Sequence, residues 1–176
     1  NYNINFSGKK TILITGHRRE SFGEGFNNIC DAVKYLSRKK NVQFIYPVHL
    51  NPNVQGPVND KLKNLSNVYL IPPQDYVPFI FLMKSSYIVL TDSGGVQEEA
   101  PSLGKPVLVM RDLTERVEGV KAGTAKLVGT NKDKIISEVS LLLDDINLYN
   151  KMSKNINPYG NGDASLKIFN YLKNNI

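Results

Sequence analysis

The feature that most constrains this chain is a series of short apolar runs, each followed by a segment of helical periodicity. Runs without polar alternation predict strands buried on both faces, and the segments between them predict covering helices. The sequence therefore predicts an α/β fold with a parallel sheet between two helix layers. Because crossovers in such units are right-handed, we expect a doubly wound, Rossmann-like sheet. The predicted strands are residues 11–14, 42–46, 68–71, 87–90, 106–110 and 126–128.

The clearest predicted helix follows the first strand, where apolar residues recur on one face from Phe26 to Leu36. Asp75 is in position to cap a later helix, whose first turn tolerates Pro78. The remaining helical segments fall at about 54–65, 79–83, 95–103, 132–144 and 163–174.

No repeat or low-complexity segment divides the chain. We expect residues 1–10 to be a linker remnant and residues 11–176 to form one domain. The first residue is Asn1, which favours a chain that is part of something longer; a processed end or tag remnant is the alternative.

Composition narrows the class of protein. Apolar residues make up 41% of the chain and charged residues 22%, as in ordinary globular proteins. The longest apolar runs, 79–83 and 107–110, are too short to span a bilayer, and no secretory signal precedes the first strand. The single cysteine, Cys30, excludes an internal disulfide and a cysteine metal cluster. We therefore expect a cytoplasmic protein without a membrane partner.

The formal net charge of +6 indicates some preference for anions. The lysines are nevertheless scattered, with no run of five or six like charges and no basic stripe interleaved with aromatic residues. Binding to nucleic acid is therefore not favoured.

Polar residues follow five of the predicted strands at the point where each strand ends. In open parallel sheets, ligands bind beyond these carboxyl ends. Both histidines of the chain and several arginines fall there, which makes this edge rich in donors for an anion. The segments concerned are 15–20, 48–51, 72–75, 92–95 and 111–116.

The turn Ser93-Gly94-Gly95 is the strongest local signal for an anion. A strand end, a glycine turn and a new helix bring several backbone N–H groups together, and glycine lets phosphate oxygens approach. The turn is neither a Walker loop nor a dinucleotide fingerprint, because neither motif occurs in the chain. A nucleotide phosphate held by this turn is the resulting hypothesis.

Two carboxylates follow the turn, and their roles stay open. Glu98 and Glu99 point about 100° apart on a helix, so at most one can face a ligand squarely. One of them could accept both hydroxyls of a ribose. Alternatively, both oppose the positive helix end, and Asp92 or Ser93 is only an N-cap.

The remaining polar residues at this edge also have two interpretations each. His17 could donate to a phosphate or protonate a leaving group, or be a loop histidine without a task. His49 could be functional or structural. Cys30 lies on the apolar helix face and is expected to pack there. The arginines could be solvated charges, or two in one cleft could match the fork geometry of a phosphate: Arg18, Arg19, Arg111 and Arg116.

Four segments of the chain closely resemble the non-hydrolysing UDP-N-acetylglucosamine 2-epimerase family. The resemblance runs from about Thr11 to Leu172 and covers only the carboxyl-terminal half of that enzyme. The segments are TGHRRESFG (15–23), YPVHLNPNV (46–54), LTDSGGVQEEAPSLGKPVLVMRDLTERVEGV (90–120) and NPYGNGDAS (157–165).

The resemblance implies a glycosyltransferase-B-like enzyme of two Rossmann-like domains, with the ligand between them. It implies interconversion of UDP-N-acetylglucosamine and UDP-N-acetylmannosamine in nucleotide-sugar metabolism for cell-surface polysaccharide, without a metal or nicotinamide cofactor. The partners implied are UDP or the UDP-sugar, the protein's own amino-terminal domain and, in the intact enzyme, a second subunit of a homodimer.

The resemblance also implies roles for particular residues. Gln74 and Phe79 would lie around the uracil, and Glu99 would hold the ribose. His17, as the catalytic residue, and Arg116 would lie near the phosphates and the sugar.

The diphosphate would rest on Ser93, Gly94 and Gly95. In some members of the family, the residues corresponding to Arg18 and His49 belong to a second, regulatory UDP-N-acetylglucosamine site.

The implied mechanism is elimination of UDP across C1–C2 of the sugar, followed by re-addition with the opposite configuration at C2. The family takes its acid and base carboxylates from the amino-terminal domain, so we expect this chain to bind UDP but not to epimerise alone. Three alternatives stay open: a hydrolysing epimerase, a glycosyltransferase of the same fold, and a non-catalytic nucleotide-sensing module.

Overall fold

The computed structural model describes residues 4–154 and 157–175. Its centre is a sheet of parallel strands in the order β3-β2-β1-β4-β5-β6. The doubly wound prediction is confirmed, and each strand lies within one residue of its predicted bounds. The strands are β1 (Lys10–Thr15), β2 (Val42–Pro47), β3 (Val68–Ile71), β4 (Ile88–Thr91), β5 (Val107–Val109) and β6 (Ala125–Leu127).

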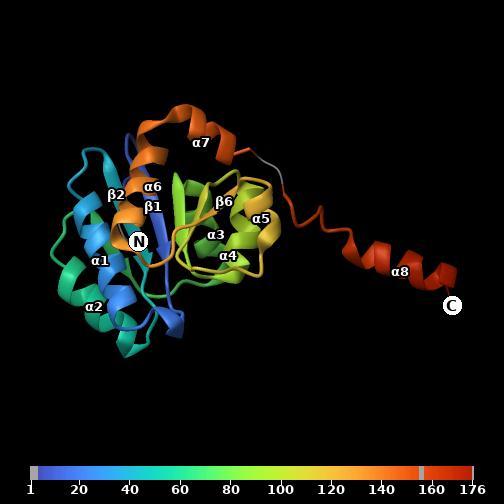
Figure 1. Cartoon of the computed structure of the whole chain (residues 1–176), viewed down its shortest axis with the longest axis horizontal. Helices are drawn as coiled ribbons and strands as arrows, with labels where there is room; N and C mark the ends of the chain where they lie inside the picture. The colour runs from blue at the N-terminus through green and yellow to red at the C-terminus, as the bar shows by residue number, and fades with distance from the viewer. Residues whose placement is uncertain (1–3, 155–156, 176) are drawn as a thin grey trace.

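The two faces of the sheet carry separate helix layers (Figure 1). Alternate residues of β1 show the division, because Ile12 and Ile14 join one buried cluster and Leu13 the other. The helices on the first face are α1 (Glu24–Leu36), α2 (Pro52–Leu62) and α6 (Lys132–Asp144). Those on the second face are α3 (Tyr76–Ser85) and α4 (Gly94–Glu99).

The chain order places a switch point between β1 and β4. From β1 the chain moves outward through β2 and β3, then returns to the other side of β1 at β4. Connections leave in opposite directions there, which opens a crevice beyond the strand ends. The polar segments after β1 and β4 therefore become neighbours.

The helix predicted at 95–103 differs from the observed one. The α-helix α4 ends at Glu99, and residues Ala100–Leu103 form a 3₁₀ turn. Pro101 explains the change, because proline has no N–H and its ring clashes with the carbonyl four residues earlier. Gly104 then takes a φ of 65°, a left-handed conformation that glycine adopts without steric cost.

Two short helices were missed by the periodicity analysis. They are α5 (Val117–Lys121) and α7 (Ile146–Met152), both too short to show a repeat of apolar residues. A side-chain signal for α7 exists, because Asp145 accepts hydrogen bonds from the amides of Asn147 and Leu148.

The last helix, α8 (Ala164–Asn175), is confirmed within one residue of its predicted bounds, but it has no buried residue. Figure 1 shows it extending away from the sheet and its layers. Its apolar residues are exposed: Leu166, Ile168, Phe169, Tyr171 and Leu172. The periodicity of the sequence thus predicted this helix correctly, but the apolar side chains of the helix are not buried in the described structure.

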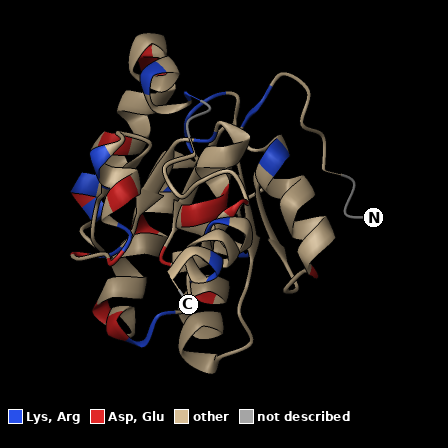
Figure 2. Ribbon diagram, turned by 90° about the vertical axis from the view of Figure 1, so that its right-hand side faces the viewer, with Lys and Arg blue, Asp and Glu red and all other residues tan. Residues whose placement is uncertain are grey.

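Residues assigned to a linker also contribute to the fold. Lys10 is the first residue of β1, and Ile4 and Phe6 pack against the cluster under α3 and α4. Basic and acidic residues lie interspersed on several elements (Figure 2). Within the described residues, no helix has the length and apolarity needed to cross a bilayer.

Candidate functional site

A hollow of about 250 Å³ lies at the carboxyl ends of the central strands. Residues that follow β1, β2, β3 and β4 line it together, as expected for the switch point. The lining includes five of the residues predicted for the site: His17, His49, Gln74, Phe79 and Ser93.

Asp92, at the end of β4, ties two strand ends together. Its side chain is fully buried, and its Oδ2 accepts hydrogen bonds from the amides of His17 at 2.7 Å and Arg18 at 2.8 Å. The carboxylate therefore fixes the loop after β1. The N-cap interpretation is wrong for the side chains of Asp92 and Ser93, because no side chain caps α4.

The two histidines stack against each other at the rim of the hollow. Their ring centroids are 5.5 Å apart and their planes differ by 19°. His17 Nδ1 lies 3.3 Å from Asp92 Oδ1, and the His17 side chain is 41% exposed. His49 Nδ1 accepts a hydrogen bond of 3.1 Å from the amide of Asn51. The His49 ring is therefore oriented by a hydrogen bond to its Nδ1, whereas His17 Nδ1 lies near a carboxylate oxygen without a hydrogen bond to it.

The turn from Ser93 to Gly95 keeps several donors available. Ser93 occupies the N-cap position of α4 and its amide donates to Thr91 Oγ1 at 2.9 Å, while its hydroxyl has no hydrogen bond with the described residues. Gly95 is exposed, and a Cβ added there would meet no atom within 4 Å. A Cβ at Gly94 would lie 3.0 Å from Cζ of Arg116. Gly94 thus makes room for a guanidinium, whereas Gly95 leaves open space.

Arg116 lies against Gly94 and is held by carboxylates. Its Nε donates to Glu98 Oε1 at 2.7 Å, and it also bonds Glu115. The hydrogen bond that Arg116 donates to Glu98 is the main cause that raises the pKa of Arg116. Glu99 is half-buried and forms no hydrogen bond or ion pair with the described residues. The two adjacent carboxylates therefore have different surroundings, and Glu98 is the one engaged with a cation.

Arg111 belongs to the same chain of charges. Its Nε donates to Glu20 at 2.8 Å and its Nη1 to Glu115 at 2.9 Å. Burial lowers the pKa of Arg111, but the hydrogen bonds that it donates to Glu20 and Glu115, with the attraction of the two carboxylates, outweigh burial and raise the pKa overall. Glu115 thus links Arg111 to Arg116. Arg18 lies elsewhere: its amide contacts Asp92, and its buried Nε has no partner among the described residues.

Three residues that the sequence analysis missed hold Arg116 in place. Thr114 Oγ1 donates to Oε1 of the buried Gln97 at 2.7 Å and accepts from the amide of Arg116 at 3.1 Å. The Tyr159 hydroxyl accepts from the amide of Gly119 and donates to the Arg116 carbonyl at 3.4 Å. All lie inside the segments quoted for the family resemblance, which was the available signal.

Gln74 and Phe79 occupy the part of the hollow formed after β3. Gln74 Nε2 donates to the carbonyl of Pro72 at 2.7 Å, and Phe79 is half-buried against the core under α3. An aromatic ring beside an amide side chain suits a planar, polar-edged group.

The single cysteine and the arrangement of potential metal ligands also limit the chemistry of the chain. Cys30 is fully buried on α1, and burial raises its pKa to about 12, so it packs as the sequence analysis expects. Among the residues with described coordinates, no cluster of three or more His, Cys, Asp or Glu side chains could hold a metal ion. The absence of a metal or other cofactor from the reaction stays a prediction.

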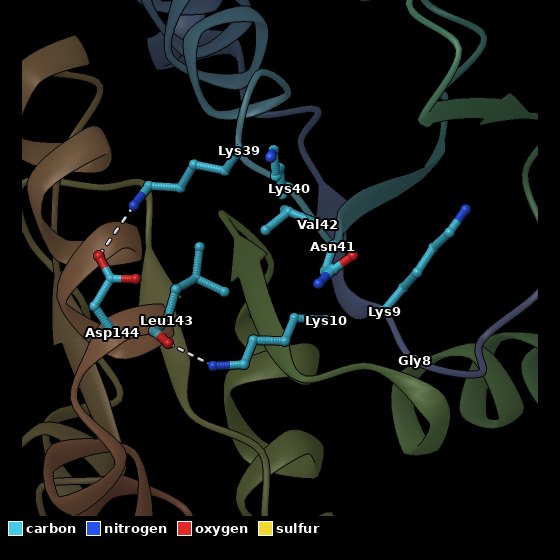
Figure 3. Close-up of a pocket in the computed structure, with 9 residues that line it drawn as sticks. All are labelled: Gly8, Lys9, Lys10, Lys39, Lys40, Asn41, Val42, Leu143 and Asp144. Carbon is cyan, nitrogen blue, oxygen red and sulfur yellow. Dashed lines mark hydrogen bonds and ion pairs between the residues drawn. The ribbon is translucent and has the colours of Figure 1, made fainter.

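A larger hollow of about 570 Å³ lies at the opposite edge of the sheet (Figure 3). It is lined by lysines at the start of β1 and before β1 and β2, and by the carboxyl end of α6: Lys9, Lys10, Lys39, Lys40, Leu143 and Asp144. None of the ten predicted site residues lines it.

A family model described as UDP-N-acetylglucosamine 2-epimerase matches residues 1–173. The chain belongs to this family. A UDP-N-acetylglucosamine 2-epimerase from Yersinia pestis is 59% identical to this chain over 169 residues, which are 96% of this chain and 45% of the relative. The chain thus spans about half the length of the curated relatives it matches.

Solved structures agree in fold. The UDP-GlcNAc 2-epimerase of Neisseria meningitidis, solved with UDP-GlcNAc, matches with a TM-score of 0.90 and 52% identity, over 94% of this chain and 45% of that one. The glycosyltransferase WaaG matches with a TM-score of 0.65 at 17% identity, over 85% of this chain and 42% of that one, which shows the fold alone. The fold is therefore that of a Rossmann-like half of a glycosyltransferase-B-type enzyme.

Proposed function

We propose that the intact protein is an isomerase that reversibly epimerises C2 of UDP-N-acetylglucosamine to give UDP-N-acetylmannosamine, and that this chain is its UDP-binding half. The observation that carries the proposal is the convergence of His17, Gln74, Phe79 and Ser93 on one hollow at the switch point. Membership of the epimerase family supplies the substrate class.

The ligand arrangement follows from the chemistry around the hollow. Phe79 and Gln74 suit the uracil. The diphosphate would lie over Ser93 and Gly95, where a hydroxyl and open backbone face the solvent. Arg116 lies against Gly94 and supplies a cation beside that position.

Glu99 would accept the ribose hydroxyls, since the described residues leave its carboxylate unengaged. Arg18 and His49 are proposed for a regulatory UDP-N-acetylglucosamine site in the intact protein. His49 also lines the hollow that contains His17, so such a site would adjoin the first one.

The reaction assigns this half a defined task. A base removes the proton from C2 of the sugar, the C1–O bond breaks with its electron pair going to UDP, and a C1–C2 double bond forms. UDP then returns to C1, and a proton is delivered to the opposite face of C2. The charge that develops on the leaving diphosphate would be stabilised by Arg116, by His17 and by the amides of the glycine turn.

Calorimetric titration of this chain with UDP, beside UMP and ADP, tests the binding proposal. We expect saturable binding of UDP and weaker binding of the other two nucleotides. Glu99→Ala should weaken UDP binding by about 10- to 100-fold, because hydrogen bonds to a charged acceptor contribute about 1.5–3 kcal/mol. A matched control is Glu138→Ala, which removes a carboxylate of α6 that pairs with Lys126. Equal binding by the Glu99→Ala variant would contradict the ribose role.

Activity needs a separate measurement on the intact protein. Product analysis should show UDP-N-acetylmannosamine, whereas free sugar with UDP would indicate a hydrolysing epimerase, and transfer to an acceptor would indicate a glycosyltransferase. We expect the intact enzyme to be a cytoplasmic homodimer, which light scattering of the purified protein and cell fractionation would check. Turnover by this chain alone would contradict its assignment as a half-enzyme.

A further inference from the structure

The buried carboxylate of Asp92 carries an inference beyond loop anchoring. Two backbone amides satisfy its Oδ2, but its Oδ1 is buried and forms no aligned hydrogen bond with the described residues. A buried carboxylate oxygen without a partner is costly. The neighbouring polar atom is His17 Nδ1, at 3.3 Å. The 3.3 Å separation is short enough for a hydrogen bond from Nδ1–H to Oδ1 once the two groups are aligned.

We propose that Asp92 is a positioning residue that holds His17 in its Nδ1–H tautomer and so presents Nε2 to the hollow. A carboxylate can only accept a hydrogen bond, so the nitrogen that faces it must carry the proton. The other nitrogen, on the far side of the ring, is then the one available to a ligand. Its role toward a diphosphate rests on the proposed function, whereas the tautomer itself does not.

His49 provides an internal comparison for this assignment. Its Nδ1 accepts a hydrogen bond from the amide of Asn51, so its neutral ring must carry the proton on Nε2. The two stacked rings therefore hold opposite tautomers, one imposed by a carboxylate and the other by a backbone amide. The chain contains only these two histidines, which makes their signals separable.

The test is a long-range ¹H–¹⁵N correlation spectrum of the labelled chain at about pH 8.5, where an ordinary imidazole is neutral. His49→Gln assigns the two rings. We expect a protonated Nδ1 in His17 and a protonated Nε2 in His49. A wild-type His17 protonated on Nε2 would overturn the proposal without any further variant.

The Asp92→Asn variant provides a second test in the same spectrum. The amide oxygen can keep the two backbone bonds, but its NH₂ group must then face His17 Nδ1 and can only donate to it. We expect the His17 tautomer to reverse to Nε2–H while His49 stays unchanged. Asp75→Asn is the matched control, because Asp75 is exposed and makes no capping bond. A folded Asp92→Asn variant with an unchanged His17 tautomer would overturn the proposal.

UDP addition separates this inference from the proposed function. If the tautomers are as expected and UDP shifts the Nε2 resonance of His17, both stand. If UDP moves neither ring while the tautomers are as expected, the diphosphate role of Nε2 fails and the Asp92–His17 pairing is supported. If UDP binds but His17 carries its proton on Nε2, the pairing fails and the UDP site stands.

Discussion

The hollows at the two edges of the sheet differ, and neither their volume nor their charge indicates which one is the binding site. The hollow at the amino edge is the larger, about 570 Å³ against about 250 Å³, and lysines crowd it. In a parallel α/β fold, however, the covering helices end at the amino edge and begin at the carboxyl edge. Cations at the amino edge therefore face the negative ends of helices.

The contacts of the amino edge bear this out. Lys10 Nζ donates to the carbonyl of Leu143 in the last turn of α6, and Lys39 pairs with Asp144 at 3.0 Å (Figure 3). Lys10 also lies 4.7 Å from the ring centroid of Tyr87. Lys10 and Lys39 are thus paired within the protein, where their positive charges lie beside the negative carboxyl end of α6.

At the carboxyl edge, Ser93 lines the smaller hollow, and Gly95 and Glu99 follow it on α4. The Ser93 hydroxyl and the Glu99 carboxylate have no hydrogen bond within the described structure, and Gly95 leaves its backbone open. The comparison teaches that a binding site is marked by groups whose hydrogen-bonding capacity the fold leaves unused. Three substitutions would sharpen or break it.

The largest expected effect is on Arg116. Arg116→Gln should weaken UDP binding about 10- to 100-fold, since it removes a charge-assisted donor and leaves Glu98 without its cation. Lys39→Gln is the matched variant at the other edge, because Lys39 is also a cation paired with a carboxylate. Calorimetry would measure both, and an equal loss in the two variants would break the comparison.

Gly95→Ala should have a smaller effect on UDP binding, about tenfold, because a methyl group would occupy space that the diphosphate needs. The free energy of unfolding should not fall, since the new Cβ meets no atom of the protein and alanine favours a helix over glycine. Gly56→Ala in α2 is the control, because its Cβ would also meet open space. Unchanged UDP affinity in the Gly95→Ala variant would place the diphosphate elsewhere.

Lys10→Met should change stability rather than binding. Loss of the bond to the Leu143 carbonyl should lower the free energy of unfolding by about 0.5–1.5 kcal/mol, measured by urea denaturation. UDP affinity should stay at the wild-type value. A weakened affinity without a change in stability would mean that the amino edge takes part in ligand binding.

Much of this fold was predictable because strand and helix signals are local. The buried runs from Ile12 to Ile14 and from Ile88 to Leu90 admit few alternatives, and the strand bounds agree within one residue. Pro101 was visible in the sequence, yet its effect on α4 was not anticipated. Both α1 and α8 carry apolar residues at helical spacing, but those of α1 are buried and those of α8 are exposed. Periodicity predicts a face and not what covers it.

The sequence predicted several residues that line the candidate site but not the hydrogen bonds that hold those residues in place. The positions of His17 and Ser93 at strand ends followed from the order of runs. The pairing of Asp92 with His17, 75 residues away, and the bond from Thr114 to Gln97 did not. Hydrogen bonds between loops depend on where the loops end in space, which no local pattern records.

The sequence by itself determined the parallel sheet, the edge that carries the ligand groups and the family to which the chain belongs, because hydrophobic periodicity and long motifs are properties of contiguous residues. Only the tertiary structure decided which charges neutralise one another and which stay available. Glu98 and Glu99 are adjacent in the chain, yet one holds Arg116 and the other does not. The reason is geometric, since a side chain's partner is set by the packing of distant segments around it.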